Sequence, residues 1–439
     1  MISKEVWGRI IRDHLEWDVK LVERSINYSI PKVQRALAII GPRRAGKTYF
    51  MFQIIKELLK QGVRKEETIY INLEDPRIID TSLDDLLGLL DVYYSQFPEN
   101  VKGHNYFFLD EIQTVKNWEK FVRFLLDKNQ RVIVSGSSSR LLSKEIATEL
   151  RGRSIPIKVY PFSFKEILIS NGIKVDRFYS TYEEAKIKKL LRQYLLWGGY
   201  PEVILDFSLR RAILQEIVDL TIYRDIIERW RVTNIKALRV LFKMLASSSH
   251  LSISKAYKNL KGIGIEVGKT TVANYLEYLE DSLIFYALKP LAKSYKLQEL
   301  YGFKPYLVDN GLMAVLGIED EGRLLENLVF VELLKAGLEP NRDLFYYRAR
   351  DNKEVDFVLK EKESVREILQ VTYEINNTNY EREVSALIRA SRELGCNDLF
   401  IITWDQEDVI KEKGKEIKVI PLWKWLLIQL QSRITNSSE

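Results

Sequence analysis

A glycine-rich stretch, GPRRAGKT, has the residue types and spacing of a phosphate-binding loop. Its glycines allow backbone N–H groups to point at the phosphates of a nucleotide. Lys47 is expected to reach the outer phosphates as a catalytic cation, and Thr48 is expected to coordinate Mg²⁺. The predicted nucleotide-binding residues are Gly41, Pro42, Arg43, Arg44, Ala45, Gly46, Lys47 and Thr48.

A second stretch, YFFLDE, is an apolar run that ends in two carboxylates. This is the form of a buried parallel strand with chemistry at its C-terminal end. Asp110 is expected to hold Mg²⁺ through water, and Glu111 to act as the general base that polarises the attacking water. No Asn-Lys-x-Asp signature for guanine occurs, so ATP is favoured over GTP.

The elements around these motifs predict a doubly wound α/β domain. Residues 36–40 form an apolar strand before the loop, and apolar residues recur at helical spacing after it, up to Gly62. Further strands are expected at 68–73, 106–111 and 131–135, with helices between them. Alternating strands and helices indicate a parallel sheet that binds its ligand at the carboxyl ends of the strands.

Two further residues are candidates for contact with the γ-phosphate. Ser137 follows the strand at 131–135, where a polar residue would sense the γ-phosphate, although a solvated serine turn explains the same pattern. Arg153 is a candidate arginine finger, acting in cis or from a neighbouring subunit, and its alternative is a solvated surface position.

Composition restricts the remaining function classes. The chain has 439 residues, a net charge of +6, one cysteine (Cys396) and three histidines that lie far apart in the sequence. A disulfide framework and histidine-based zinc chemistry are therefore not expected. The charged N-terminus does not resemble a signal peptide, and no apolar run is long enough for a membrane helix. A cytoplasmic location and no membrane contact are expected.

In order along the chain, GPRRAGKT, FLDEIQTVKNWEK, VSGSSS, LRGRSIPIKVYPFSFKEIL, WGGYPEV, YLVDNGL, RLLENLVFVELL and EVDFVL resemble the prokaryotic AAA-type ATPases with a DUF4143 C-terminal domain. The resemblance implies an α/β P-loop NTPase sheet, a helical or winged-helix domain and an α/β nuclease-like C-terminal domain. The expected boundaries are 1–32 for N-terminal helices, 33–205 for the ATPase domain, 206–300 for the winged-helix domain, 301–428 for the PD-(D/E)xK-like domain and 429–439 for a polar tail.

The middle segment independently predicts a winged helix. Helices are expected at 237–246, 253–260 and 269–276, followed by a wing strand at 283–288. The third helix would face outward with Lys269, Thr271, Asn274 and Tyr278, as a DNA-recognition helix does. The acidic residues at 277, 280 and 281 would repel phosphates, so an interdomain lid remains an alternative.

The C-terminal region raises the question of a nuclease site. Glu354 and Asp356 lie two residues apart on an expected strand and point to one face. Glu326 on the preceding helix could complete a metal site there, and a structural cap or an ion-pair partner is an equal alternative. Thr372 stands where a PD-(D/E)xK nuclease has its catalytic lysine. Because this motif lacks the cation that would offset transition-state charge, DNA cleavage is not expected.

The leading hypothesis is Mg²⁺-dependent ATP hydrolysis that drives a conformational switch. One alternative is a DNA-associated nuclease or mobile-element ATPase, and another is a nucleotide-gated protein-interaction module. The candidate partners are ATP, DNA through the winged helix, a protein that the sequence does not identify, and a second copy of the chain.

Overall fold

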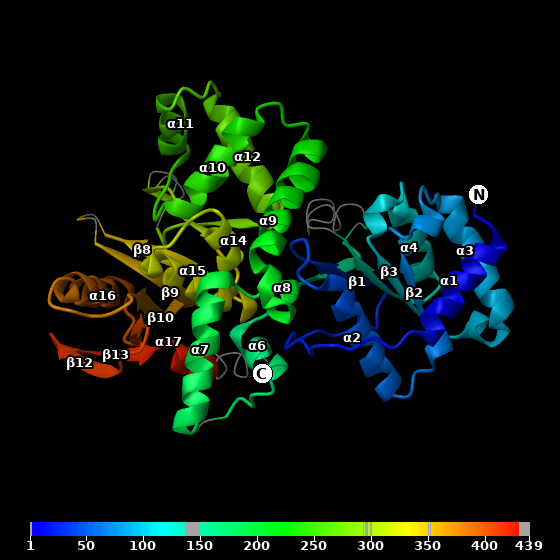
Figure 1. Ribbon diagram of the computed structural model, residues 1–439, viewed down its shortest axis with the longest axis horizontal. Helices are drawn as coiled ribbons and strands as arrows, with labels where there is room; N and C mark the ends of the chain where they lie inside the picture. Colours follow the sequence, from blue (N-terminus) through cyan, green and yellow to red (C-terminus); the bar gives the residue numbers. More distant parts are fainter. Residues whose placement is uncertain are drawn as a thin grey trace. The chain divides into compact units, whose positions relative to one another are not determined.

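The computed structural model describes residues 2–136, 150, 152–176, 178–292, 294, 297–298, 301–349, 351 and 353–429. The chain divides into two compact units, Met1–Tyr160 and Pro161–Glu439 (Figure 1). We call them unit 1 and unit 2. The finer domain boundaries expected from the sequence stay predictions.

Unit 1 is built on a parallel sheet of five strands in the order β2-β3-β4-β1-β5. Its strands are β1 (Ala36–Ile40), β2 (Thr68–Asn72), β3 (Tyr106–Asp110), β4 (Arg131–Ser135) and β5 (Ser154–Lys158). The apolar runs that predicted β1 and β3 are buried almost completely, as expected for strands covered on both faces. The predicted parallel sheet of a P-loop NTPase fold is therefore confirmed.

Helices cover both faces of this sheet. The first face packs against α1 (Lys4–Glu16), α3 (Leu83–Gln96) and α4 (Trp118–Asp127), which share one apolar core with it. The second face packs against α2 (Lys47–Lys60). Short 3-10 turns connect these elements at Lys65–Glu67, Pro76–Ile78, Pro98–Lys102 and Ile112–Thr114.

The N-terminal region differs from its prediction. Helices were expected through residue 32, but α1 ends at Glu16 and residues 17–31 form neither helix nor strand. This segment lies against α2 instead, where the backbone N–H of Arg24 donates to Gln53 Oε1 at 2.7 Å and Gln53 Nε2 donates back to the Arg24 carbonyl at 3.2 Å. The paired amide bonds replace the hydrogen bonds that a helix would have made.

Unit 2 begins with helices. They are α6 (Phe164–Ser170), α7 (Thr181–Trp197), α8 (Pro201–Leu205), α9 (Arg210–Leu220), α10 (Ile235–Ser247), α11 (Ile253–Gly262) and α12 (Lys269–Asp281). A 3-10 turn, Phe207–Leu209, precedes α9, and a π-helical stretch, Thr221–Glu228, continues it. After α12, β6 (Phe285–Leu288) pairs antiparallel with β7 (Lys304–Leu307).

The rest of unit 2 is a mixed sheet of six strands in the order β12-β13-β11-β10-β9-β8. The strands are β8 (Leu344–Arg348), β9 (Glu354–Glu361), β10 (Ser364–Val371), β11 (Leu399–Thr403), β12 (Asp408–Glu412) and β13 (Lys415–Pro421). The associated helices are α14 (Asn310–Val315), α15 (Glu321–Lys335), α16 (Tyr380–Leu394) and α17 (Leu422–Lys424), which a π-helical stretch, Trp425–Gln429, follows. An apolar core joins the sheet to α16. Within the described ranges, no helix is both long and apolar enough to cross a membrane.

Candidate functional sites

The phosphate-binding loop of unit 1 lies between the end of β1 and the start of α2. Gly46 caps α2 with a φ of 95°, a left-handed conformation that favours glycine. Gly41 allows a close backbone approach, because a Cβ there would lie 2.0 Å from the carbonyl oxygen of Val159. The loop is therefore held tightly at the N-terminus of a 14-residue helix, where backbone N–H groups and the helix dipole favour an anion.

Lys47 lies folded across this loop. Its side chain is buried, and Nζ donates to the carbonyl oxygens of Gly41 and Pro42 at 3.2 Å each. Neutral carbonyls are weaker partners for an ammonium than a phosphate would be. The loop thus holds a cation that is ready to accept an anionic partner.

Thr48 and Asp110 meet beside the loop, as the sequence predicts. Thr48 Oγ1 donates to Asp110 Oδ2 at 2.7 Å, and the hydroxyl of Tyr70 donates to the same oxygen at 2.8 Å. Ser135 Oγ donates to Asp110 Oδ1. Burial raises the pKa of the Asp110 carboxyl, and the nearby charge of Glu111 adds to this effect, whereas the three hydroxyl donors oppose it.

Glu111 lies next to this group in an unusual backbone conformation, with a φ of 52°. Its N–H donates to Ser135 Oγ at 3.2 Å, and its carboxylate oxygen Oε2 accepts from Gln113 Nε2 at 2.5 Å. Ser135 therefore connects the side chain of Asp110 to the backbone of Glu111. The two predicted carboxylates are fixed relative to each other by one buried hydroxyl.

Arg24, from the N-terminal segment, contacts the backbone of the loop. Its Nη1 donates to the carbonyl oxygen of Ala45 at 3.0 Å, and its Nη2 donates to that of Tyr160 at 2.5 Å. A buried guanidinium has five donors in a fixed plane, so it can hold two chain segments at a defined spacing. The segment before β1 therefore helps to shape the loop.

These residues fit a nucleotide with Mg²⁺. The protein offers Thr48 and Asp110 near the loop, and Mg²⁺ usually takes its other ligands from phosphates and water. Over the ranges that the structure covers, no cluster of three His, Cys, Asp or Glu side chains could hold a metal ion.

Two predicted site residues are not brought to the loop. Ser137 lies outside the described residues. Arg153 lies at the opposite end of the strands from the loop, because β5 runs parallel to β1 with Ser154 beside Ala36, whereas the loop follows Ile40. There Arg153 Nη1 forms an exposed ion pair with Asp127 at 2.7 Å. A role for Arg153 at the γ-phosphate in cis is thus wrong, and a role from a neighbouring subunit stays a prediction.

Sequence reasoning missed Tyr70, Ser135, Gln113 and Arg24. Ser135 ends the predicted strand and could have been found by asking which hydroxyl lies beside the end of β3 in a parallel sheet. Gln113 follows the acidic pair by two residues but belongs to no motif in the sequence. Tyr70 resembles an ordinary buried strand residue, so nothing in the pattern marks it.

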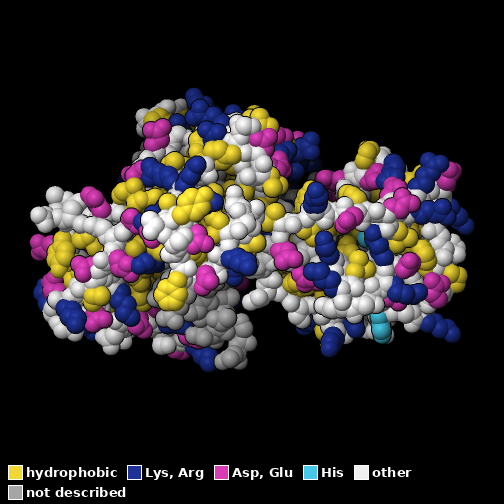
Figure 2. Space-filling model, turned by 60° about the horizontal axis from the view of Figure 1, so that its bottom comes forward, with side chains coloured by type: hydrophobic (Ala, Val, Ile, Leu, Met, Phe, Trp, Pro, Cys, Tyr) yellow, Lys and Arg dark blue, Asp and Glu magenta, His cyan; other side chains and the backbone are white. Residues whose placement is uncertain are grey.

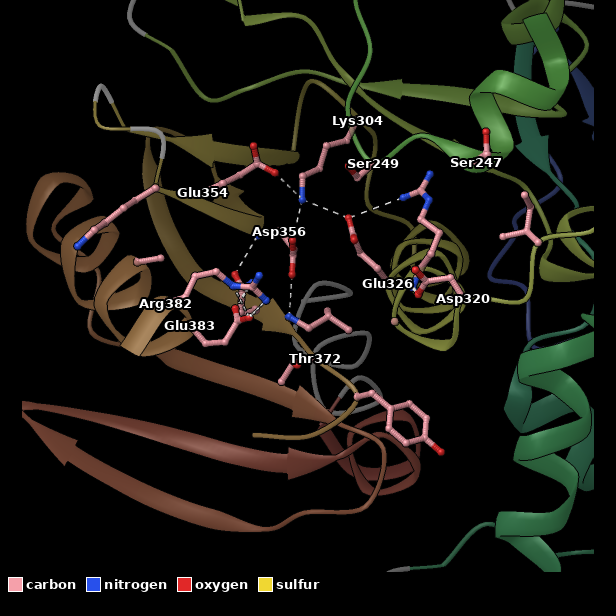
Figure 3. A pocket seen from close by; sticks show the side chains of 18 of the residues that line it. Ser247, Ser249, Lys304, Asp320, Glu326, Glu354, Asp356, Thr372, Arg382 and Glu383 are labelled. Carbon is pink, nitrogen blue, oxygen red and sulfur yellow. Dashed lines mark hydrogen bonds and ion pairs between the residues drawn. The ribbon is translucent and has the colours of Figure 1, made fainter. Parts of the chain in front are cut away.

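A second charged site lines a cavity of about 910 Å³ in unit 2 (Figure 3). Lys304, the first residue of β7, is 2% exposed and lies between three carboxylates. Its Nζ is 2.6 Å from Asp356 Oδ1, 3.0 Å from Glu354 Oε1 and 3.2 Å from Glu326 Oε1. We call these four residues the lysine–carboxylate cluster.

Lys304 and the carboxylates of this cluster shift each other's pKa. Burial alone would lower the pKa of Lys304, but the surrounding carboxylates raise it well above its ordinary value, so the amine stays charged. Burial raises the pKa of Asp356 to about 7, and Lys304 opposes this shift. Tyr306 donates to Glu326 at 2.6 Å, and the backbone N–H of Val371 donates to Asp356 at 2.8 Å.

The cluster corrects one expectation. The sequence predicted that Glu354, Asp356 and Glu326 could come together, and they do, but the expectation that a cation is missing is wrong. Thr372 indeed provides none, and its hydroxyl donates to the carbonyl of Glu374. The cation comes instead from Lys304, 52 residues before Asp356 in the chain, a separation that no local motif could show.

Exposed Lys and Arg side chains, interspersed with acidic ones (Figure 2), include a group on the helices before β6, which we call the basic surface of unit 2. Lys258, Lys261 and Lys269 are exposed, and none of them forms an ion pair with another described residue. Tyr278 does not project freely as expected, because its ring stacks on Trp230 with centroids 4.4 Å apart. The surface offers cations on α11 and at the start of α12.

Comparison with known proteins defines the class of this chain. A family model described as "AAA domain" matches residues 33–168, and two domains of unknown function, DUF8612 and DUF4143, match residues 188–322 and 321–425. The chain is thus a P-loop ATPase-type protein with an AAA domain and a DUF4143 domain.

Two relatives that match most of the chain identify its family. An uncharacterized protein of Methanocaldococcus jannaschii, MJ1544, is 39% identical over 442 residues, covering 97% of this chain and 96% of its own. An uncharacterized protein of Haemophilus influenzae is 31% identical and covers 79% of this chain and 84% of its own. The chain belongs to this archaeal and bacterial family.

Two solved structures have lower similarity to this chain. A Walker-type ATPase of Pyrococcus abyssi has a TM-score of 0.43 at 15% identity, covering 72% of this chain and 96% of its own. The ORC2 protein of Aeropyrum pernix, in ADPNP–ADP complexes, has a TM-score of 0.39 at 12% identity, covering 76% and 94%.

Proposed function

We propose that unit 1 binds ATP with Mg²⁺ and hydrolyses it, and that the bound nucleotide switches the conformation of the protein. The observation that carries this proposal is the contact between the loop hydroxyl of Thr48 and the carboxylate of Asp110. A hydroxyl at the loop and a carboxylate at the end of the neighbouring strand are the two protein groups that a nucleotide-bound Mg²⁺ needs.

Different residues of this site would bind the nucleotide and take part in its hydrolysis. Lys47 exchanges its two carbonyl partners for the outer phosphates, and Glu111 takes a proton from the attacking water. Asp110 is oriented by three hydroxyls and so keeps one position toward the loop. Magnesium, when bound, offsets the charge of the phosphate oxygens.

The direct test is nucleotide binding and hydrolysis by the full chain, with Mg²⁺ and with EDTA. Titration with a fluorescent ATP analogue measures affinity, and phosphate release measures turnover. Asp110→Asn should lower turnover by at least roughly 10-fold, because the neutral amide no longer attracts the cation. Asp127→Asn is the matched control, since Asp127 lies in an exposed ion pair far from the loop. Equal turnover of the wild type in Mg²⁺ and in EDTA would refute the proposal.

A link to DNA rests on the basic surface of unit 2. The α10–α12 helices and the β6–β7 pair are consistent with a winged helix, and Lys258, Lys261 and Lys269 can contact phosphates. Hydrolysis measured with double-stranded, single-stranded and no DNA tests this link. Stimulation that Lys258→Ala with Lys261→Ala removes would support it, whereas a partner captured in ATP but not in ADP would favour the nucleotide-gated interaction module.

A second candidate function is DNA cleavage at the lysine–carboxylate cluster. Lys304 favours it, because a buried ammonium beside Asp356 and Glu354 supplies the positive charge that the sequence motif lacks. Purified protein is incubated with supercoiled and linear DNA in Mg²⁺ or Mn²⁺, beside Asp356→Ala. Nicking that the variant loses supports the candidate, and intact DNA in both reactions excludes it.

A further inference from the structure

The turn after β3 holds Glu111 in a conformation that few glutamates adopt. Its φ of 52° lies in the left-handed region, which is unfavourable for residues with a side chain. Two hydroxyls hold the backbone there: Ser135 Oγ accepts from the N–H at 3.2 Å, and Thr114 Oγ1 donates to the carbonyl at 3.0 Å. Such strain persists only where the surroundings impose it, and it is concentrated at functional sites.

Gln113 lies on the same turn and contacts the side chain of Glu111. Its Nε2 donates to Glu111 Oε2 at 2.5 Å. The other end of the amide, Oε1, is buried and accepts no hydrogen bond from any residue that the structure describes. A buried acceptor without a partner costs about 1–3 kcal/mol, and water or a ligand usually satisfies such a group.

We propose that Gln113 is a positioning residue for the water that attacks ATP, an inference that rests on the proposed hydrolysis. A water molecule has two hydrogens, and its oxygen is aimed only when both have acceptors. Glu111 can take one, because a carboxylate has about four acceptor positions and Gln113 uses one of them. The amide oxygen of Gln113 takes the other, which turns a lone pair of the water toward the γ-phosphorus.

Hydrolysis forms one bond and breaks one. A bond forms between the water oxygen and the γ-phosphorus, and the bond to the bridging oxygen of ADP breaks. One proton of the water passes to Glu111, and the other stays on the new phosphate. Gln113 exchanges no proton. It acts through orientation alone, by holding Glu111 with its N–H and the water with its oxygen.

The experiment measures ATP affinity and single-turnover hydrolysis for the full chain and four variants. They are Gln113→Ala, Gln113→Glu, Glu111→Gln and the double variant Glu111→Gln/Gln113→Ala. Gln34→Ala is the matched control. Gln34 is exposed and lies just before the N-terminal end of β1, whereas the loop follows the C-terminal end of that strand. Gln113→Ala should slow hydrolysis by roughly 10- to 100-fold with affinity within about twofold of the wild type. Gln113→Glu, which keeps an acceptor but loses the donor, should be intermediate.

The double variant separates positioning from a merely structural role. If Gln113 acts through Glu111 and its water, its removal should add little to the loss that Glu111→Gln already causes. A full multiplication of the two losses would overturn the inference, as would hydrolysis by Gln113→Ala within twofold of an active wild type. A wild type that binds ATP but does not hydrolyse it would instead overturn the proposed function and this inference together.

Discussion

Two buried lysines, Lys47 in unit 1 and Lys304 in unit 2, differ in what surrounds their charge. Lys47 is 6% exposed and donates to two neutral carbonyls, whereas Lys304 is 2% exposed and contacts three carboxylates. A charge with only neutral partners is left for an incoming anion to compensate, while a charge among carboxylates is already compensated. From this difference we propose that Lys47 serves a ligand, whereas the charge of Lys304 is already offset by the carboxylates of its own cluster.

Lys47→Ala tests the first half of this comparison and should have the largest effect, the loss of detectable ATP binding. The variant removes the cation proposed to face the phosphates, and among the described residues Lys47 Nζ contacts the neutral carbonyls of Gly41 and Pro42. Titration with a fluorescent ATP analogue measures the affinity. Lys56→Ala, an exposed position on the same helix, should bind normally. Unchanged affinity in Lys47→Ala would remove Lys47 from the site.

Lys304→Met tests the second half. The change leaves the buried Asp356 and the partly buried Glu326 and Glu354 without their cation, and breaking a buried ion pair in this way costs about 3–5 kcal/mol. Urea unfolding at pH 7.5 measures the free energy of unfolding of unit 2, and Lys353→Met on the cavity rim is the control. ATP affinity should stay unchanged. A loss below about 1 kcal/mol would mean that the carboxylates are neutral in the fold.

The sequence predicted a site correctly in position where its residues are contiguous in the chain. The loop at 41–48 and the pair Asp110–Glu111 are contiguous motifs, so their places at the ends of two strands followed from strand and helix patterns. The lysine–carboxylate cluster draws on β7, α15 and β9, and only the folded chain brings them together. Arg153 was predicted from its place after the other ATPase motifs in the chain. That order did not reveal that Arg153 precedes β5 at the end of the sheet away from the loop.

Glu111→Gln separates binding from chemistry in unit 1, an effect smaller than the loss of Lys47. The amide keeps the shape of the side chain but cannot take a proton from water, so turnover should fall by roughly 10²-fold or more while ATP affinity persists. Single-turnover hydrolysis is the measurement, with Glu119→Gln at a partly exposed position of α4 as the control. Normal turnover with intact binding would assign the role of base to another residue.

The smallest predicted effect is a divergence of the two units with pH. Burial lowers the pKa of His14 in unit 1 to about 4. Its unfolded value is 6.5, so the unfolded state binds the extra proton between pH 6.5 and 4, and unit 1 loses stability as the pH falls through that window. At pH 5 the loss from this group is about 2 kcal/mol.

Asp356 in unit 2 should act in the opposite direction. Its folded pKa of about 7 exceeds its ordinary value of 3.8, so the folded state binds the extra proton, and this group stabilises unit 2 as the pH falls from 7 toward 4.

Hydrogen exchange at pH 5 and 7.5 in EDTA, corrected for intrinsic rates, reports on peptides of each unit separately. His14→Gln should remove the acid loss in unit 1, because the amide can still meet the Thr68 hydroxyl that His14 contacts at 3.1 Å. Asp356→Asn should remove the acid gain in unit 2. If both units instead lost stability together on acidification, the cluster around Lys304 would not hold a carboxyl that titrates near neutrality, and the contrast between the two buried lysines would fail.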